Sequence, residues 1–288
     1  MPEGDTIFRT AEVLGAVLEG EEVLAARGRP GGVQLERVVG SRVERVESAG
    51  KHLLISFSNG LTLHTHMQMV GEWHRYRTGE RWRRGASRAV AVVQVGRGVA
   101  VCFDAPTVEL METRALRIHR GLRRLGPDLI GEDFGEDEAL ERLRIPALSG
   151  DAVGEALLDQ RVVAGIGNVF RSEICFIDRV DPFAPVGSLP DETLRRLLHT
   201  ARRLLQVNRR SPARTTTPDL LGGQPGSGGP RSAAGSLWVY GRAGRPCRRC
   251  GSPIRTLVHG TTLPRRVFWC PGCQPASTVR EAVAPAGS

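Results

Sequence analysis

The first apolar pattern in the chain repeats with the period of an α-helix. Over residues 2–19 the apolar positions that share one helical face are Ile7, Ala11, Leu14 and Leu18. Gly20 comes directly after this stretch, where a glycine commonly ends a helix. The pattern therefore predicts one amphipathic helix at the start of the chain.

Short apolar runs replace the helical pattern from residue 21 to about residue 113, and Gly, Pro and Asn separate them. The runs predict strands over residues 23–26, 43–47, 53–57, 61–65, 90–95 and 99–103. Ser58-Asn59-Gly60, between two of these runs, is typical of a hairpin turn. Several short strands at this spacing predict a β-sandwich. With the helix, the sandwich is expected to form a first, N-terminal domain over residues 1–114.

Helical patterns return after residue 114, in a stretch rich in arginine. They predict helices over residues 137–143, 151–158, 169–177 and 191–207. The last is the most regular, and the arginines on its polar side are interpreted as a solvated face: Arg195, Arg196, Arg202 and Arg203. We therefore expect a helical second domain over residues 115–235 and an α+β fold for the whole chain.

The end of the chain changes texture twice. Residues 211–236 are rich in Gly, Pro and Thr and poor in apolar residues, so they are expected to form a flexible loop. A compact cysteine-rich module follows over residues 237–274. Residues 275–288 are expected to be a disordered tail.

Composition and net charge indicate what kind of partner the protein binds. The chain has 288 residues, 40% of them hydrophobic and 25% charged, which is typical of a soluble globular protein. Its net charge of +9 favours a polyanionic partner. No apolar run approaches the ~20 residues that span a bilayer, and the N-terminus lacks the pattern of a signal peptide. We therefore expect a cytoplasmic monomer with no membrane partner.

Lysine is almost absent from the sequence. Of the 40 basic residues, 39 are arginine and one is Lys51. Arginine keeps its proton in proteins, whereas lysine carries a compact charge and can act in proton transfer. We therefore expect a functional role for Lys51.

Four cysteines form two Cys-x2-Cys pairs that are nineteen residues apart: Cys247, Cys250, Cys270 and Cys273. This spacing is typical of a tetrahedral Zn²⁺ site. A disulfide pairing is the alternative, and a reducing cytoplasm disfavours it. Because four thiolates fill the coordination sphere, one structural zinc is expected, on a β-hairpin that presents Arg265 and Arg266 from a loop. Cys102 and Cys175 lie in apolar runs and are expected to be buried.

The first residues offer a second kind of chemistry. If Met1 is removed, as the small side chain of Pro2 permits, the chain begins with a free secondary amine. Such an amine condenses with an aldehyde-like carbon to give an iminium, and Glu3 beside it could move protons. The alternative is that Pro2-Glu3 only opens the first helix, because proline and acidic residues both suit that position.

A glycine-rich turn joins two of the predicted helices. Its sequence is Gly165-Ile166-Gly167-Asn168, and Asn168 is expected to cap the helix that follows. Amides at a helix start can bind a phosphate. A Gly-x-Gly turn alone is more often structural.

Two features of the fourth predicted strand are weaker. Gln68-Met69-Val70 follow it, and a polar and an apolar side chain at a loop tip could wedge into a base stack, although such residues are usually core. His64 and His66 have metal-like spacing on one strand face, but no acid or thiol partner is evident. We interpret the two histidines as structural.

These motifs, in this order, resemble those of the formamidopyrimidine-DNA glycosylase and endonuclease VIII family of base-excision repair enzymes. The family begins with Pro-Glu, carries a lysine after a glycine in the sandwich, ends a helix-two-turn-helix with Gly-x-Gly-Asn and closes with a zinc finger. The matching residues are Pro2-Glu3-Gly4, Gly50-Lys51, Gly165-Ile166-Gly167-Asn168 and Trp269-Cys270-Pro271-Gly272-Cys273-Gln274. The resemblance covers almost the whole chain, and its N-terminus is most similar to the actinobacterial branch of endonuclease VIII.

The resemblance implies a bifunctional DNA glycosylase and AP lyase that acts on damaged DNA and favours oxidised pyrimidines. It implies that Pro2 attacks C1′ of the damaged nucleotide, which expels the base and forms an iminium, while Glu3 shuttles protons. Elimination at the 3′ phosphate and then the 5′ phosphate would cut the strand. Lys51 matches the lysine that contacts phosphate near the lesion and is needed for glycosylase activity.

The resemblance also implies DNA-binding residues. The positions that fill the space left by the extruded nucleotide are matched by Gln68, Met69 and Val70. Asn168 matches a residue that grips the backbone, and Arg265 matches the finger arginine that holds phosphates beside the lesion. One position departs from the pattern, because a second acidic residue of endonuclease VIII is replaced here by Thr6.

Two alternative functions stay open from the sequence. A non-catalytic zinc-containing DNA-binding protein would keep the finger and the basic surface without needing Pro2, Glu3 or Lys51. Within the family, the rival is an enzyme for oxidised purines such as 8-oxoguanine or FapyG.

Overall fold

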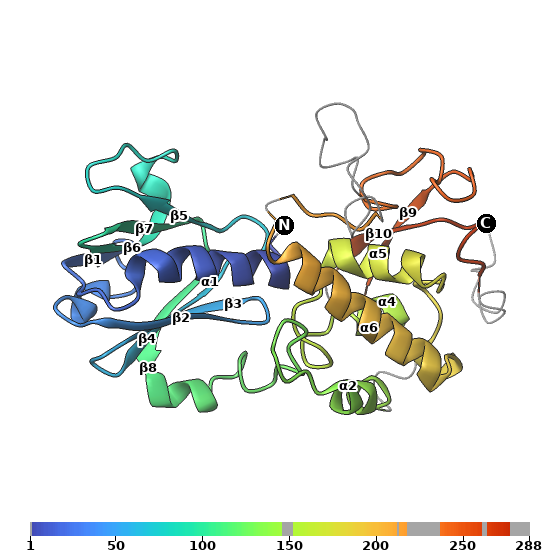
Figure 1. Cartoon of the computed structure of the whole chain (residues 1–288), viewed down its shortest axis with the longest axis horizontal. Helices are drawn as coiled ribbons and strands as arrows, with labels where there is room; N and C mark the ends of the chain where they lie inside the picture. The colour runs from blue at the N-terminus through green and yellow to red at the C-terminus, as the bar shows by residue number, and fades with distance from the viewer. Residues whose placement is uncertain (1, 146–151, 212, 218–236, 261–263, 277–288) are drawn as a thin grey trace. The chain divides into compact units, whose positions relative to one another are not determined.

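The chain folds into two compact units, Met1–Leu125 and Gly126–Ser288 (Figure 1). The computed structural model describes residues 2–145, 152–211, 213–217, 237–260 and 264–276. Most of the expected flexible loop 211–236 and of the expected tail 275–288 lies outside the described residues. Among the residues that are described, no helix is long and apolar enough to cross a membrane.

The first unit begins with helix α1 (Gly4–Leu18). Its predicted apolar face is buried, and the exposed fractions of Ile7, Ala11, Leu14 and Leu18 are 1%, 5%, 1% and 0%. The helix begins two residues later than predicted, because Glu3 is still extended, with φ −125° and ψ −179°. Gly20 follows the helix with φ +78°, a conformation that glycine adopts without strain.

Eight strands follow α1 and form two antiparallel sheets. Their bounds are β1 (Ala25–Gly28), β2 (Val43–Ala49), β3 (His52–Phe57), β4 (Leu61–His66), β5 (Glu72–Tyr76), β6 (Ala89–Val95), β7 (Gly98–Phe103) and β8 (Thr107–Glu112). One sheet has the order β1-β6-β7-β5 and the other β2-β3-β4-β8. Their inner faces and α1 share one hydrophobic core, so the predicted β-sandwich is confirmed.

The sequence pattern missed two of these strands and shifted a third. Strand β5 was not predicted because three of its five residues are charged or polar, and β8 was not predicted because half of its six residues are. Strand β1 lies two residues later than the run that predicted it. The predicted hairpin turn joins β3 to β4. In this turn Gly60 has φ +78°, and its N–H donates to Phe57 O at 3.0 Å.

The second unit is mainly helical. Its helices are α2 (Glu136–Leu143), α4 (Val153–Ala156), α5 (Asn168–Ile177) and α6 (Asp191–Asn208), and a hairpin is formed by β9 (Arg255–His259) and β10 (Arg265–Trp269). The helix predicted over residues 151–158 is thus only four residues long, and residue 151 lies outside the described chain. Short 3₁₀ helices complete the described structure: η1 (Leu35–Val38), η2 (Ala86–Arg88), η3 (Thr113–Arg117) and η4 (Val186–Ser188).

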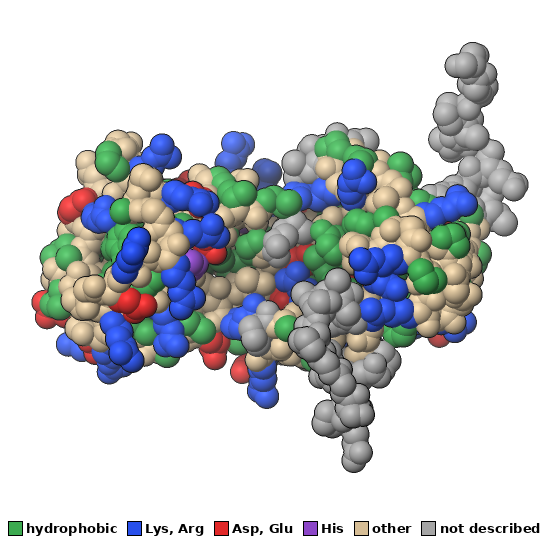
Figure 2. Space-filling view, turned by 90° about the horizontal axis from the view of Figure 1, so that it is seen from above, with side chains coloured by type: hydrophobic (Ala, Val, Ile, Leu, Met, Phe, Trp, Pro, Cys, Tyr) green, Lys and Arg blue, Asp and Glu red, His purple; other side chains and the backbone are tan. Residues whose placement is uncertain are grey.

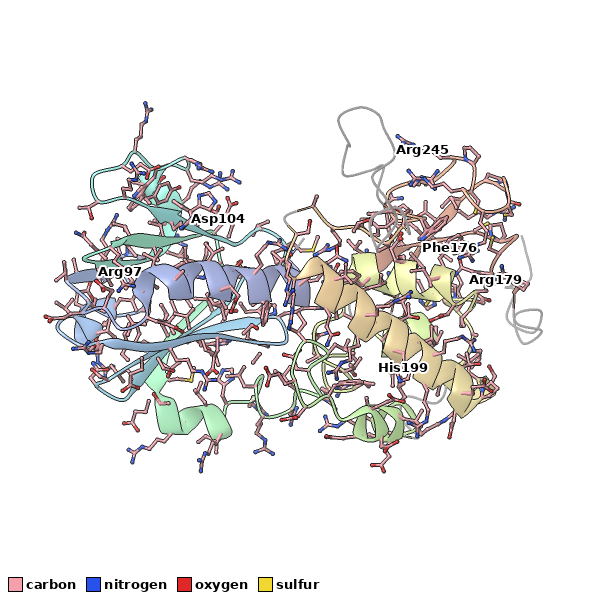
Figure 3. The ribbon with its side chains drawn as sticks, in the orientation of Figure 1. Arg97, Asp104, Phe176, Arg179, His199 and Arg245 are labelled. Carbon is pink, nitrogen blue, oxygen red and sulfur yellow. The ribbon has the colours of Figure 1, made fainter. Side chains whose placement is uncertain are left out.

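The polar side of α6 is more than a solvated face. Arg195 binds Glu136 at 2.9 Å and Asp137 at 2.7 Å, so it connects α6 to the start of α2. His199, which projects from α6 in Figure 3, contacts the other oxygen of Glu136 at 2.5 Å. The solvated face expected for most of these arginines therefore has an exception in Arg195.

A buried carboxylate connects α5 to the segment that leads into the cysteine-rich module. Glu173 is fully buried, and its two oxygens accept the backbone N–H groups of Trp238, Val239 and Tyr240 at 2.8–2.9 Å. The Thr216 hydroxyl donates to the same carboxylate. A buried charge is stable only where several donors surround it, as they do here.

We expect Glu173→Gln to lower the free energy of unfolding by about 1–3 kcal/mol, because the new amide N–H₂ cannot accept from the Trp238 N–H. Chemical denaturation measures this loss. Glu141→Gln is the matched control, because Glu141 lies exposed on α2, and it should change stability by less than about 0.5 kcal/mol. Equal stability of the two variants would contradict the role of the Glu173 carboxylate.

Candidate functional site

The N-terminal end of α1 holds Pro2 and Glu3 in fixed positions. The Glu3 carbonyl accepts the N–H groups of Thr6 at 2.9 Å and Ile7 at 3.0 Å, which are the first hydrogen bonds of the helix. Glu3 is fully buried and Pro2 is half-buried. Glu3 therefore occupies the cap position of α1 and Pro2 directly precedes it, an arrangement that is compatible with a chemical role for both residues.

Lys51 lies at the tip of the hairpin that joins β2 to β3. Ala49 pairs with His52, so the loop contains only Gly50 and Lys51. Gly50 has φ +57°, which a two-residue hairpin turn requires at its first position. The glycine thus fixes the turn, and the turn presents Lys51 at the end of the sheet.

Strand register brings Lys51 to the same end of the sheet as the loop after β4. His52 of β3 pairs with His66 of β4, and the two strands are antiparallel. Lys51 comes one residue before His52, and Gln68 comes two residues after His66. The two loops are therefore neighbours within the first unit.

Helix α1 runs along β2, and its first turn lies near the loop that joins β2 to β3. Its C-terminal end is fixed at the start of β2, where the Val46 N–H donates to Glu19 Oε1 at 2.7 Å and the Gly20 N–H donates to Val43 O at 2.9 Å. A helix of 15 residues is about 22 Å long, close to the roughly 23 Å of a seven-residue strand. The start of α1 therefore lies at the end of the sandwich where the β2–β3 loop is found (Figure 1).

The loop after β4 is strained and exposes apolar side chains. Gln68 has φ +45°, a conformation that costs a residue with a side chain on the order of 1–3 kcal/mol. Met69 and Val70 are 56% and 62% exposed. A Cβ on Gly71 would lie only 2.8 Å from Met67 O, so glycine is needed to close the turn. The three side chains of residues 68–70 project from the sandwich instead of joining its core.

Two histidines beside Lys51 are held neutral. Burial lowers the pKa of His66 to about 4, and the charge of Lys51 contributes to the shift. Burial also lowers the pKa of His52 to about 3, with nearby histidines and Lys51 as smaller causes. Both imidazoles are therefore uncharged near neutral pH, beside a lysine that carries charge.

A glutamine that was assigned no role on sequence grounds organises the glycine-rich turn before α5. Gln160 Nε2 donates to Leu158 O at 2.7 Å and to Ile166 O at 3.0 Å, and its Oε1 accepts the Gly165 N–H at 3.0 Å. Gly165 has φ +110°. The sequence could have indicated such a residue, because the backbone N–H and C=O groups of a tight loop need hydrogen-bond partners.

Asn168 is the first residue of α5 and does not cap it. Gly167 occupies the cap position, and the Asn168 amide instead donates to Arg266 O of β10 at 3.0 Å. Arg171, which is almost fully buried, donates to Asn168 Oδ1 and, at 3.2 Å, to the same Arg266 carbonyl. The prediction of an asparagine cap is wrong, because contact with the hairpin fixes this side chain.

Arg265 lies beside this contact, at the first position of β10. The prediction placed Arg265 and Arg266 in a loop, whereas both belong to the strand, and Arg265 pairs with His259 of β9. Arg265 is half-buried and Arg266 is exposed. Asn168 and the arginine pair are thus neighbours within the second unit.

The four knuckle cysteines meet in one cluster with the dimensions of a tetrahedral metal site. Their sulfur atoms all lie within 4.8 Å of one another, with Cys247–Cys273 at 3.9 Å and Cys250–Cys270 at 3.4 Å. Tetrahedral thiolates at ~2.3 Å from Zn²⁺ lie about 3.8 Å apart. Burial raises the pKa of Cys273 to about 12, so a cation would have to hold it as a thiolate. The residues present fit a structural metal ion.

The two other cysteines are buried as predicted. Cys102 and Cys175 each have an exposed fraction of 0%. Burial raises the pKa of Cys175 to about 12 and that of Cys102 further. Neither thiol is therefore nucleophilic at neutral pH.

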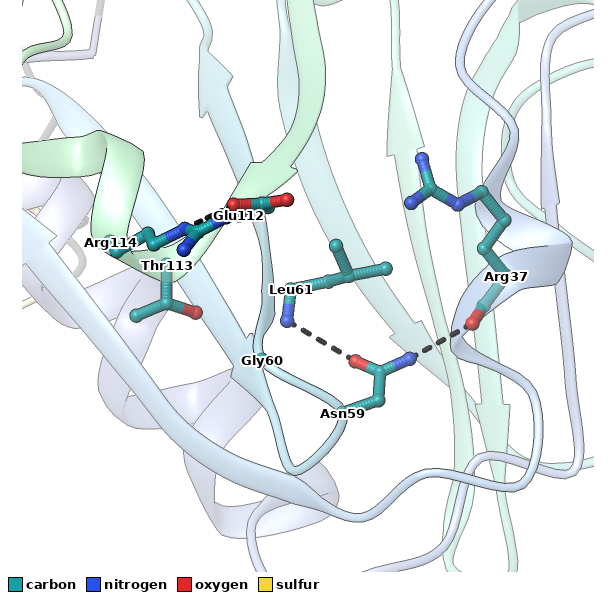
Figure 4. A pocket seen from close by; sticks show the side chains of 7 residues that line it. All are labelled: Arg37, Asn59, Gly60, Leu61, Glu112, Thr113 and Arg114. Atoms are coloured by element: carbon teal, nitrogen blue, oxygen red, sulfur yellow. Dashed lines mark hydrogen bonds and ion pairs between the residues drawn. The ribbon is translucent and has the colours of Figure 1, made fainter.

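A shallow pocket lies at the opposite end of β3 from Lys51. Around it, Asn59 Nδ2 donates to Arg37 O at 2.9 Å and the Leu61 N–H donates to Asn59 Oδ1 at 3.2 Å (Figure 4). These bonds are typical of a structural turn, and no predicted site residue lines the pocket. Arginine and lysine side chains are instead spread widely over the face seen in Figure 2.

Two family models match the chain. Residues 1–107 match the formamidopyrimidine-DNA glycosylase N-terminal domain, and residues 125–217 match the formamidopyrimidine-DNA glycosylase H2TH domain. Among solved structures, a complex between the Lactococcus lactis Fpg and DNA containing an abasic site has a TM-score of 0.78 at 22% identity and covers 96% of this chain and 100% of its own. A complex of MutM with DNA containing carbocyclic 8-oxo-G has a TM-score of 0.76 at 22% identity, with 96% and 100% coverage. These likenesses show the fold.

Curated relatives align along nearly the whole chain. A probable endonuclease 8 2 of Streptomyces coelicolor is 40% identical over 276 residues, covering 95% of this chain and 94% of the relative. The DNA-(apurinic or apyrimidinic site) lyase Nei2 of Mycolicibacterium smegmatis is 38% identical over 277 residues, covering 96% and 100%. Endonuclease 8 of Escherichia coli O17:K52:H18 is 34% identical over 279 residues, covering 95% and 100%. This chain belongs to the formamidopyrimidine-DNA glycosylase and endonuclease 8 family of DNA-repair enzymes.

Proposed function

We propose that this DNA glycosylase and AP lyase removes oxidised pyrimidines from damaged DNA and cuts the strand by β,δ-elimination through a Schiff base on Pro2. The observation that carries the proposal is the convergence of three segments at one end of the sandwich. These are the start of α1, the Gly50-Lys51 turn and the exposed loop of residues 68–70. The protein acts as a monomer.

Pro2 is the nucleophile once removal of Met1 has freed its amine. Its nitrogen lies at the positive end of the α1 dipole, which disfavours a protonated amine and so preserves the lone pair. The lone pair attacks C1′ of the damaged nucleotide, and the base departs with the electrons of the glycosidic bond. Opening of the sugar ring then gives the iminium.

Glu3 moves the protons of these steps. Its backbone is fixed by the first two hydrogen bonds of α1, and it directly follows Pro2 in the chain. It delivers a proton to the ring oxygen O4′ as the sugar opens. Glu3 then removes a proton from C2′, which expels the 3′ phosphate. A second elimination expels the 5′ phosphate.

Lys51 and residues 68–70 act on the DNA around the reacting sugar. Lys51 binds phosphate near the lesion, and the neutral His52 and His66 leave its charge available for that contact. The nucleotide must leave the base stack before Pro2 can reach C1′. Met69 and Val70, both exposed on a strained turn, fill the space it vacates, together with Gln68.

The second unit binds the DNA backbone. Asn168 lies at the start of α5, the end of a helix that favours an anion, and Arg265 lies near it on β10. A zinc ion bound by the four cysteines would cross-link the two knuckles and hold the β9–β10 hairpin in its fold. Asn168 and Arg265 thereby bind neighbouring phosphates.

The covalent mechanism predicts that borohydride will trap a protein–DNA adduct on abasic-site DNA, because it reduces the iminium. We expect Glu3→Gln to slow strand cleavage by about 10²–10⁴-fold, the range for loss of a general acid–base group. Protein that retains an N-terminal tag should give no adduct, whereas the same protein with the tag cleaved to expose Pro2 should give it. Trapping by the tagged form, or none by protein whose free Pro2 is verified by mass spectrometry, would overturn the mechanism.

The same assay separates the alternatives. A non-catalytic DNA-binding protein would cut none of a lesion panel at any concentration. Single-turnover rates on duplexes with thymine glycol, 5-hydroxyuracil and 8-oxoguanine should be faster for the two pyrimidines, and a faster rate on 8-oxoguanine would refute the pyrimidine preference.

Lys51→Arg keeps the charge but replaces a compact ammonium with a planar guanidinium. We expect base excision to slow at least about tenfold, which corresponds to roughly 1.4 kcal/mol of transition-state stabilisation. Cleavage of DNA with a preformed abasic site should change much less and serves as the internal control. Unchanged base excision would show that the solitary lysine has no special role.

Cys250→Ser removes one of the four thiolates, so the protein should lose its zinc and bind DNA more weakly. Metal content per chain and DNA affinity at fixed salt are the measurements. Cys102→Ala is the matched control, since this thiol is buried in the first unit and should leave the zinc content unchanged. Retention of one zinc with unaltered DNA affinity in Cys250→Ser would argue against a zinc-stabilised finger.

A further inference from the structure

A second cluster of metal-ligating side chains lies on the outer face of the β2-β3-β4-β8 sheet. His64 on β4 and Glu109 on β8 are directly opposite each other in the antiparallel register. His119, from the segment after η3, reaches the same Glu109 carboxylate. The neighbouring residues Leu63 and Leu61 of β4 point into the core, so the cluster occupies the other face of the strand. We call His64, Glu109 and His119 the histidine–glutamate cluster.

The donor atoms of the cluster converge on a point. Glu109 Oε2 lies 2.8 Å from His64 Nδ1 and 3.2 Å from His119 Nε2, and one donor atom from each residue lies within 4.8 Å of the others. Two ligands bound tetrahedrally at ~2.0–2.1 Å from Zn²⁺ lie about 3.3 Å apart. The separations from Glu109 Oε2, 2.8 and 3.2 Å, are close to this value.

We propose that His64, Glu109 and His119 bind a second divalent transition-metal ion of the Zn²⁺ class, separate from the four-cysteine site. Two imidazole nitrogens and one carboxylate oxygen are a donor set that such ions prefer over Ca²⁺ or Mg²⁺. Three protein ligands leave a fourth position for water. The ion would join β4, β8 and the segment after η3 into one structure.

His52 orients the cluster from behind. Its Nδ1 lies 2.8 Å from His64 Nε2, on the side of the His64 ring that faces away from Glu109. When His64 Nδ1 binds the ion, the His64 proton moves to Nε2 and His52 Nδ1 accepts it. A ligating histidine in proteins regularly donates its other N–H to such a partner. Burial keeps His52 uncharged, so it can take this role.

The corresponding change at His119 costs little. Its Nδ1 accepts the Leu122 N–H at 3.3 Å, which is long for a hydrogen bond, and the N–H must find another acceptor when the ring proton moves to Nδ1. The side chains of Glu109 and His119 are 46% and 22% exposed, so solvent and an ion can reach the cluster. The segment after η3 covers the rest, since a Cβ on Gly121 would lie 3.6 Å from His52 Cε1.

Electrostatics allow a cation here although Lys51 is close in sequence. The charge of Lys51 acts on His52 and His66. At His64 the charged group that dominates is the Glu109 carboxylate, which opposes the effect of burial. When an ion binds beside Glu109, the carboxylate exchanges its hydrogen bonds with the two histidines for an ionic contact with the metal.

Full-length protein that carries its finger zinc is the material for the test. Isothermal titration with Zn²⁺, together with metal content after desalting, should reveal a second equivalent. His119→Asn and Glu109→Gln should weaken this second equivalent at least tenfold, and both change partly exposed side chains that the fold tolerates. His52→Phe removes no ligand and should weaken it about 10–100-fold through lost orientation.

The control variant is His199→Asn. His199 also contacts a glutamate, at 2.5 Å, but Arg195 already binds that carboxylate, and the pair has no second imidazole among the described residues. Its second equivalent should equal that of the wild type. X-ray absorption of Co²⁺ added as the second ion should report nitrogen and oxygen neighbours. Uptake of a single equivalent, equal uptake by every variant, or sulfur around cobalt would each overturn the proposal.

Discussion

The buried Glu173 carboxylate ties the helical and cysteine-rich parts of the second unit together. It replaces water around a charged group with three backbone N–H donors and a threonine hydroxyl, all from segments far from α5 in sequence. Nine of the ten residues of α5 are buried, so this helix is the centre about which the unit is built. Removing any of the donors would leave the buried charge with less compensation, which proteins tolerate poorly. The position of residues 238–240 is therefore set by α5.

The same helix links the glycine-rich turn to the cysteine cluster. Asn168 and Arg171 both donate to the carbonyl of Arg266, and β10 continues from there to Trp269 and then to Cys270. A metal ion that folds the hairpin therefore also places the acceptor that holds Asn168. The two features proposed to bind DNA in the second unit are therefore joined in one hydrogen-bonded structure, although about a hundred residues separate them in sequence.

Much of this arrangement could be predicted from local pattern, and the failures have a common cause. The helices α1 and α6, six of the strands, the hairpin turn at Gly60 and the cysteine site follow from periodicity, glycine placement and spacing. Strand β8 was missed because the polar–apolar alternation of Thr107-Val108-Glu109-Leu110 is too short to stand out. With it the acid partner of His64 was missed, because Glu109 lies opposite that histidine only through strand pairing. Asn168 was assigned a local role as a cap, but a contact with β10 determines its position. Local patterns predict elements, whereas pairing between distant segments decides which side chains meet.

The candidate reactive residues lie at the ends of regular elements because only there can a side chain or an amine leave the packed core. Pro2 precedes a helix whose far end is fixed to β2, Lys51 sits on a two-residue turn, and the loop of residues 68–70 begins where β4 ends. The last two of these positions are fixed by backbone features with no chemistry of their own. The turn of Lys51 depends on the positive φ of Gly50, and the loop of residues 68–70 depends on the close backbone approach at Gly71. A side chain at either glycine would move a functional loop without touching a reacting atom. The chemistry proposed for this end of the sandwich therefore depends on these two glycines as well as on Pro2 and Lys51.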